Sequence, residues 1–133
     1  MGGYKHIEES ILHYISKKYQ NVVEIGIGNN FEVASCLLKA GLKVLGTDVV
    51  QKSDNPPVPF AVDDIFEPET GLYMGADLLY AIRPGPEMVP PAIDLAKKIN
   101  CDLLVYHLGN EIYGDGGRIV DCGVILHYYH TRV

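Results

Sequence analysis

The sequence has no long uninterrupted apolar run. Its longest apolar stretches have the length of a strand, whereas a membrane-spanning helix needs about 18 uncharged residues. The N-terminal segment M-G-G-Y-K-H-I-E-E also lacks the apolar core of a secretion signal. We therefore expect a cytoplasmic protein with no membrane as its partner.

Basic residues are scarce as well. The chain of 133 residues has 11 lysines and arginines against 17 aspartates and glutamates, which gives a formal charge of −6. Proteins that hold a nucleic-acid backbone by themselves usually carry a surplus of positive charge. The acidic balance therefore argues against nucleic acid as a stand-alone partner.

Cysteine is equally sparse. Cys36, Cys101 and Cys122 lie far apart and form no C-x-x-C pair, which indicates neither a disulfide framework nor a zinc knuckle. His127 and His130 are three residues apart, and this spacing in a strand places them on opposite faces. We therefore expect no metal site, and we expect the cysteines to be small core residues.

The spacing of apolar residues predicts alternating helices and strands. Residues 4–20 have the period of an amphipathic helix, residues 31–40 form a second helix, and Pro90 and Pro91 begin a third. The Pro-rich segment after the second strand leaves little room for another helix. The expected strands are residues 22–26, 43–48, 58–62, 77–82, 101–107, 118–122 and 124–130.

This order of elements predicts one α/β domain over residues 1–133. Alternating strands and helices form an open, mostly parallel sheet with right-handed crossovers. The last two strands are separated by Gly123 alone, so we expect an antiparallel C-terminal edge. The expected architecture is a Rossmann-like three-layer sandwich with a sheet of about six to seven strands.

The first strand ends in a glycine turn, E-I-G-I-G, where open α/β sheets bind ligands. Gly26 and Gly28 permit a tight turn and the close approach of a ligand. The dinucleotide pattern G-x-G-x-x-G requires a third small residue, but Phe31 occupies that position. A carboxylate at Glu24 would repel a pyrophosphate and attract the ammonium and sulfonium of S-adenosylmethionine, which favours this ligand over NAD.

Further carboxylates follow the next two strands. Asp48 ends the second strand, where it can accept hydrogen bonds from a ribose diol. Asp63 and Asp64 follow the third strand, where a carboxylate can accept from an adenine amino group while the Ile65 N–H serves a ring nitrogen. Each feature alone is also typical of an ordinary turn. Their order after three successive strands predicts a nucleoside pocket.

In these segments the sequence resembles the class I S-adenosylmethionine-dependent methyltransferases, over residues 20–107. The matching features are E-I-G-I-G as the family's acidic-x-G-x-G motif, the acid after the second strand, and D-I after the third. The resemblance implies a cofactor site that consists, from the methionine end to the adenine end, of Glu24, Gly26, Gly28, Asp48, Asp64 and Ile65.

Two other segments, D-D-I-F-E-P and I-R-P-G-P-E, resemble a small archaeal family of methyltransferase-like proteins to which no reaction is assigned. The sequence departs from the larger methyltransferase family in three respects. The helix after the second strand is shortened, the C-terminal part is abbreviated, and no N-P-P-Y base-methylation motif follows the fourth strand.

Two residues at strand ends are candidates for catalysis. Arg83 follows the fourth strand and would project near the sulfonium, where it can hold a carboxylate or phosphate of a substrate. The alternative for Arg83 is an ion pair with Glu87 or Asp64. His107 ends the fifth strand and is the best-placed general base, and its alternative is a structural, hydrogen-bonded histidine.

The sequence supports two functions. The first is binding of S-adenosylmethionine with methyl transfer to an acceptor that these motifs do not identify. The second is a non-catalytic nucleoside-binding or scaffold module of the same fold. NAD-dependent redox chemistry is less favoured than either. A chain this short has little length for a substrate-recognition cap, so a protein partner or a homodimer would supply one.

Overall fold

The computed structural model describes residues 2–109 and 111–133. Its α-helices are α1 (Gly2–Lys18), α2 (Glu32–Lys39) and α3 (Val89–Ile99), and two 3-10 helices are η1 (Thr70–Leu72) and η2 (Pro86–Met88). The strands are β1 (Asn21–Ile25), β2 (Lys43–Asp48), β3 (Phe60–Val62), β4 (Leu78–Ile82), β5 (Asp102–Tyr106), β6 (Arg118–Asp121) and β7 (Ile125–His130).

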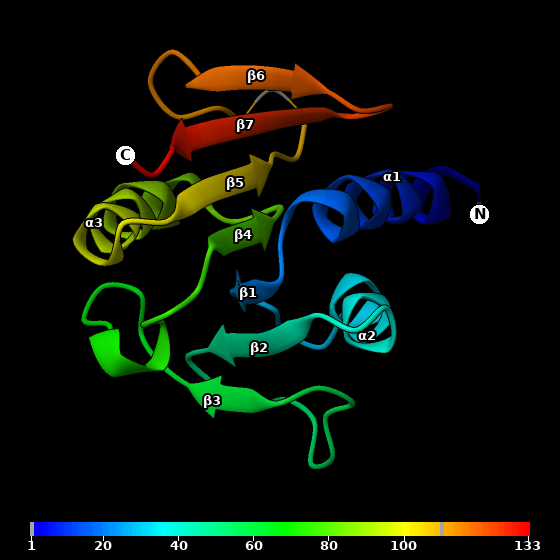
Figure 1. Ribbon diagram of the computed structural model, residues 1–133, viewed down its shortest axis with the longest axis vertical. Helices are drawn as coiled ribbons and strands as arrows, with labels where there is room; N and C mark the ends of the chain where they lie inside the picture. Colours follow the sequence, from blue (N-terminus) through cyan, green and yellow to red (C-terminus); the bar gives the residue numbers. More distant parts are fainter. Residues whose placement is uncertain (1, 110) are drawn as a thin grey trace.

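All these strands form one sheet in the order β3-β2-β1-β4-β5-β7-β6 (Figure 1). The pairs β1–β2, β1–β4, β2–β3 and β4–β5 are parallel, whereas β7 runs antiparallel to both β5 and β6. The chain reverses between β6 and β7 at Gly123, whose φ of 106° suits glycine. This confirms the expected mostly parallel sheet with antiparallel C-terminal strands.

Helices cover both faces of the sheet and make three layers (Figure 1). On one face, Ile11 and Ile15 of α1 and Leu37 of α2 pack in a core cluster with side chains of β1, β2, β4, β5 and β7. On the other face, Leu95 of α3 and Tyr73 after η1 belong to a second cluster. Residues four apart share one face of a helix, which is why the apolar stripe of α1 faces the sheet.

Hydrogen bonds of tyrosine hydroxyl groups on α1 and at Tyr19, directly after it, stabilise the contact of this segment with the C-terminal strands. The Tyr19 hydroxyl donates to Oδ2 of Asp102 over 2.6 Å and lies 2.7 Å from the Tyr128 hydroxyl. The Tyr14 hydroxyl lies 2.8 Å from the same Tyr128 oxygen. The Arg118 guanidinium lies 4.4 Å from the centroid of the Tyr128 ring. These contacts connect α1 with β5, β6 and β7.

The cysteines differ in part from the expected core positions. Cys101 is fully buried, but Cys36 and Cys122 are only half-buried, and all three are free thiols. Cys36 lies on α2 with its Sγ 3.8 Å from a Glu32 carboxylate oxygen, and Cys122 lies at the turn between β6 and β7. A helix flank and a turn leave a side chain partly open to solvent, which explains the difference.

No helix in the described part of the chain is both long and apolar enough to cross a bilayer. Within residues 2–109 and 111–133, no three His, Cys, Asp or Glu side chains are grouped so as to hold a metal ion.

Candidate functional site

The carboxyl ends of β1 and β2 meet in one hydrogen-bonded turn. Oδ2 of Asp48 accepts a hydrogen bond from the Gly28 N–H over 2.7 Å, and Oδ1 accepts one from the Val49 N–H over 2.7 Å. The Gly26 N–H donates to the Thr47 carbonyl over 2.9 Å. The φ angles of Gly26 and Gly28 are 69° and 61°, in the left-handed region that favours glycine. The structure therefore brings Gly26, Gly28 and Asp48 together.

A cavity of about 20 Å³ lies beside this turn. A cavity of this volume holds about one water molecule, so a nucleoside enters only if neighbouring side chains move. Cε of Met88 lies 3.0 Å from the position that a Cβ would occupy on Gly26, and thus fills the space beside the first glycine. The cavity is lined by Ile25, Gly26, Thr47, Asp48, Val49, Asp63, Ile65 and Met88.

The two aspartates after β3 occupy different positions. Asp63 lines the cavity, and its Oδ2 accepts a hydrogen bond from the Tyr73 hydroxyl over 2.6 Å. Asp64 is exposed, and its Oδ1 accepts from the Phe66 N–H over 2.9 Å, as in an Asx turn. Ile65 is buried and lines the cavity. Of the adenine-side candidates, the structure places Ile65 at the cavity wall and Asp64 outside it.

Glu24 lies on the α1 side of the sheet. Val23 and Ile25 belong to the core cluster under α3, so alternation along β1 directs Glu24 to the opposite face. The side chain is 3% exposed, and burial raises the pKa of its carboxyl to about 8. The Glu8 carboxylate raises this pKa further by a smaller amount, and the nearby Tyr80 hydroxyl opposes the shift. Glu24 is therefore mostly protonated at pH 7, which differs from the anion assumed from the sequence.

Two buried oxygens beside β1 have no hydrogen-bond partner among the described residues. They are Oε1 of Glu24 and the hydroxyl of Tyr80. Burial of the Tyr80 hydroxyl, with the Glu24 carboxyl as a second cause, raises the pKa of Tyr80 well above its usual range. Both groups therefore stay protonated near neutral pH, and each could bind a further polar group.

Arg83 follows β4 and contacts the end of β5. Its φ of 54° is unusual for a residue other than glycine. Its N–H donates to the Tyr106 carbonyl over 2.6 Å, and its guanidinium carbon lies 5.2 Å from the Tyr106 ring centroid. The segment from Arg83 to Met88 therefore extends from the end of β5 to the glycine turn.

His107 follows β5 and is buried, with 5% of its surface exposed. Its Nε2 lies 2.6 Å from the Tyr129 hydroxyl, and its ring centroid lies 5.0 Å from that of His127. Burial, followed by the neighbouring His127, lowers the pKa of His107. The imidazole is consequently neutral near pH 7.

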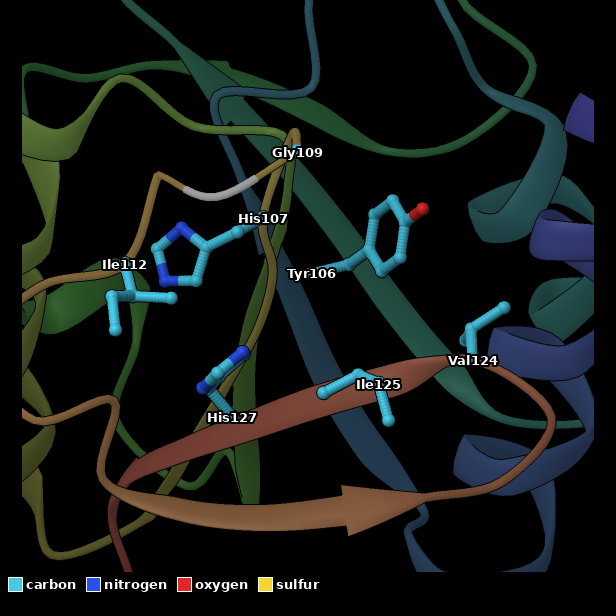
Figure 2. Close-up of a pocket in the computed structure, with 7 residues that line it drawn as sticks. All are labelled: Tyr106, His107, Gly109, Ile112, Val124, Ile125 and His127. Atoms are coloured by element: carbon cyan, nitrogen blue, oxygen red, sulfur yellow. The ribbon is translucent and has the colours of Figure 1, made fainter.

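A second and larger pocket, with a volume of about 470 Å³, opens at the end of β5 (Figure 2). In Figure 2 the rings of His107 and His127 and the side chain of Ile112 lie on one side, across from Val124 and Ile125. No motif in the sequence predicted this pocket. The pairing of β5 with β7 brings the two histidines together. The only feature of the sequence that could have indicated this is the alternation of side chains along the strand I-L-H-Y-Y-H. Tyr106 and Gly109 complete the lining.

A protein-family model described as an uncharacterised protein family, UPF0146, matches residues 7–130. The chain belongs to the UPF0146 family. A UPF0146 protein of Archaeoglobus fulgidus is 37% identical over 106 residues, which cover 79% of this chain and 78% of that protein. Another, from Pyrococcus horikoshii, is 36% identical over 104 residues, covering 75% and 79%. These UPF0146 relatives confirm the resemblance to a small archaeal family.

Solved structures of methyltransferases share the fold of this UPF0146 chain. A TehB-like SAM-dependent methyltransferase from Corynebacterium glutamicum has a TM-score of 0.64 and 16% identity, covering 95% of this chain and 88% of that one. Magnesium protoporphyrin IX methyltransferase from Synechocystis PCC 6803, solved with bound SAM, has a TM-score of 0.60 and 16% identity, covering 89% and 71%. These similarities confirm the methyltransferase-like Rossmann fold.

Proposed function

We propose that this UPF0146 chain binds S-adenosylmethionine at the carboxyl ends of β1, β2 and β3 and transfers its methyl group to a small acceptor. The hydrogen bond between Asp48 Oδ2 and the Gly28 N–H carries this proposal, because it joins the acid after β2 to the glycine turn. From the methionine end to the adenine end, the proposed cofactor residues are Glu24, Gly26, Gly28, Asp48, Asp64 and Ile65.

Asp48 retains the capacity to bind a ribose diol. Each of its carboxylate oxygens accepts one backbone N–H, and a carboxylate oxygen can accept two hydrogen bonds. The two remaining acceptor positions suit two vicinal hydroxyl groups. The Gly28 N–H is already engaged by a carboxylate, which makes it a poor donor to a pyrophosphate. This arrangement favours a nucleoside over a dinucleotide.

The cofactor enters when Met88 leaves the glycine turn. The side chain is unbranched and flexible, and it ends a short 3-10 helix rather than a long rigid element. A rotation of this side chain would join the space beside Gly26 to the cavity at Asp48 and Ile65. The sulfonium would then lie near the segment that begins at Arg83.

Methyl transfer depends mainly on placing the acceptor in line with the carbon–sulfur bond. Arg83 and His107, the two candidates from the sequence, both follow strands at the same edge of the sheet as the glycine turn. Arg83 would orient the acceptor from the end of β4. The hydrogen bond between His107 and Tyr129 favours a positioning role for His107.

Calorimetric titration of the parent protein and of Glu24→Gln with S-adenosylmethionine, adenosine and NAD tests the proposal. We expect the parent to bind S-adenosylmethionine and adenosine. Above pH 8, where the Glu24 carboxyl is ionised, we expect Glu24→Gln to weaken S-adenosylmethionine by about 1–2 kcal/mol more than adenosine, because only the former loses a contact with its ammonium. A variant that gains affinity for NAD alone, with no binding of S-adenosylmethionine, would overturn the proposal.

The non-catalytic module is the second candidate, and the small cavity beside Met88 favours it, since a filled site suits a protein that no longer turns over cofactor. Incubation with S-adenosylmethionine labelled in its methyl group distinguishes the two. Binding of the cofactor without transfer of label to any small molecule supports the module.

A further inference from the structure

We infer that the pocket at the end of β5 binds a neutral aromatic or heteroaromatic molecule with one O–H or N–H group, and that His127 accepts the hydrogen bond of that group. The inference deepens the proposed function and rests on it in one respect: the bound molecule is the class of methyl acceptor. Binding to the pocket itself is testable without the cofactor.

The hydrogen bonds of Tyr129 determine which nitrogen of His107 carries the proton. The Tyr129 hydroxyl accepts from the Tyr113 N–H over 3.0 Å and lies 2.6 Å from His107 Nε2. We assign its proton to the contact with Nε2, because this gives the hydroxyl both a donor and an acceptor partner. Because Nε2 accepts, neutral His107 holds its proton on Nδ1. This Nδ1 is buried and has no hydrogen-bond partner among the described residues. It is an unused donor in a side chain that lines the pocket.

His127 supplies the complementary acceptor. Its Nδ1 lies 2.7 Å from the Gly116 carbonyl oxygen, which can only accept, so Nδ1 carries the proton. With Nδ1 as the donor, Nε2 is the ring atom that can accept a hydrogen bond, and no hydrogen bond to Nε2 is found within residues 2–109 and 111–133. Figure 2 shows the His127 ring extending from β7 toward His107. The pocket thus has one donor, Nδ1 of His107, and one acceptor, Nε2 of His127.

The rest of the lining favours a neutral ligand with a flat apolar body. Beyond the two histidines, the described part of the lining comprises two isoleucines, a valine, a tyrosine and a glycine, with no lysine, arginine or carboxylate among them. An ionised ligand would find no opposite charge among these side chains, and the Arg83 guanidinium, 5.2 Å from the Tyr106 ring centroid, is not one of them. A pocket of about 470 Å³ is of the size that holds small molecules, and isoleucine and tyrosine side chains pack well against a ring.

The location of the pocket connects it with the cofactor site. Tyr106 pairs with Ile82 at the end of β4, and β4 lies next to β1, which leads into Gly26. Neighbouring strands are about 4.8 Å apart, so the pocket lies about two strand spacings from the glycine turn at the same edge. The segment from Arg83 to Met88 contacts Tyr106 in the pocket lining and Gly26 in the glycine turn.

The methyl transfer from S-adenosylmethionine to the bound acceptor conserves atoms and electrons. The lone pair of the acceptor oxygen or nitrogen forms a bond to the methyl carbon, and the electron pair of the carbon–sulfur bond returns to sulfur. The products are the methylated acceptor and the thioether S-adenosylhomocysteine. The proton of the acceptor group passes to His127 Nε2.

Three related probes test the pocket in the full chain without cofactor: 2-naphthol, its methyl ether and 2-naphthoate. Imidazole ¹⁵N chemical shifts report on each histidine. We expect 2-naphthol to bind and shift the His127 and His107 signals, the methyl ether to bind about tenfold more weakly, and the anionic naphthoate not to bind. Unchanged imidazole signals with 2-naphthol, or equal affinity for naphthoate, would overturn the inference.

Matched variants separate a direct contact from a structural effect. His127→Asn retains an N–H for the Gly116 carbonyl but removes the Nε2 acceptor, and we expect about tenfold weaker binding of 2-naphthol. His130→Asn is the control. His130 lies on the same strand as His127 but outside the pocket, and its Nδ1 has an equivalent contact of 2.9 Å with the Cys101 carbonyl. Full affinity in His127→Asn would contradict the inference.

A second variant covers the case in which His127→Asn fails to fold. His107→Gln keeps an acceptor for the Tyr129 hydroxyl and removes the Nδ1 donor, so 2-naphthol should again bind more weakly while the fold persists. Titration with S-adenosylmethionine separates the two proposals. Cofactor binding without any response to 2-naphthol refutes only the pocket, whereas a histidine response without cofactor binding refutes only the proposed cofactor site.

Discussion

Cε of Met88 lies 3.0 Å from the point where a Cβ on Gly26 would stand. The two residues belong to η2 and to the turn after β1, far apart in the sequence. Gly26 is thus required for two reasons, namely its φ of 69° and the presence of the Met88 side chain. The same contact leaves a cavity of only about 20 Å³ at the proposed cofactor site.

We expect Met88→Ala to tighten the binding of S-adenosylmethionine by about 1 kcal/mol, because the ligand no longer has to displace a side chain. Calorimetry measures the change. Met74→Ala is the control, since Met74 is exposed and lies outside the cavity. Weaker binding by Met88→Ala would show that Met88 forms part of the bound site.

Gly26→Ala should lower the free energy of unfolding by about 1–2 kcal/mol, because alanine resists the left-handed region. It should also abolish cofactor binding, since its methyl group occupies the approach path. Combining it with Met88→Ala relieves the steric contact but not the strain of the backbone. Denaturant unfolding of the single and double variants measures both contributions, and normal cofactor binding by Gly26→Ala would refute the role of the turn.

Asp48→Ala should weaken adenosine binding by about 1.5–3 kcal/mol, because two ribose hydroxyls lose a charged acceptor. Adenosine is the suitable ligand, since it lacks the ammonium and sulfonium. We expect the variant to fold, although the Gly28 and Val49 N–H groups lose their partner. Asp48→Asn retains one acceptor and should have an intermediate affinity. Equal affinity of parent and Asp48→Ala would exclude the ribose assignment.

The stability of the protein should depend on pH through Glu24. The folded-state pKa of about 8 exceeds the ordinary value of 4.5, so between these values the folded chain holds a proton that the unfolded chain releases. The free energy of unfolding therefore falls as the pH rises from 4.5 to 8. Glu24→Gln removes this titration, and its Tm relative to the parent should increase from pH 5 to pH 9.

Comparing the Tm of the parent with that of Glu24→Gln at each pH separates the effect of Glu24 on stability from that of His107. The lowered pKa of His107 makes it lose stability as the pH falls below its ordinary value of 6.5, but this effect is common to both chains. Thermal unfolding by circular dichroism measures Tm. A difference that stays constant across this range would mean that Glu24 is ionised in the folded chain.

Tyr19→Phe should reduce the free energy of unfolding by about 1–3 kcal/mol, because the Asp102 carboxylate and the Tyr128 hydroxyl both lose a buried partner. Tyr14→Phe, within α1, is the matched control for Tyr19, which follows the end of α1. It removes a single contact with Tyr128 and should cost less. Urea denaturation ranks the two variants, and equal losses would indicate that Asp102 contributes nothing to this cluster.

The sequence alone predicted the elements of the fold and the arrangement of the glycine turn. Apolar periodicity is a local property, so it identified α1, the central strands and the missing helix after β2 within a few residues. Parallel strands end at one edge of a sheet, which is why the order of Gly26, Gly28 and Asp48 was enough to predict that they lie together.

Only the tertiary structure decided how these groups are ionised and which of them meet. The pKa of Glu24 depends on its burial beneath α1. The contact of Met88 with Gly26 depends on where η2 packs, and the ring contact between His107 and His127 depends on the antiparallel register of β7. Each is a distance between residues remote in the chain. Such distances follow from how strands and helices pack, and no local pattern of residues encodes them.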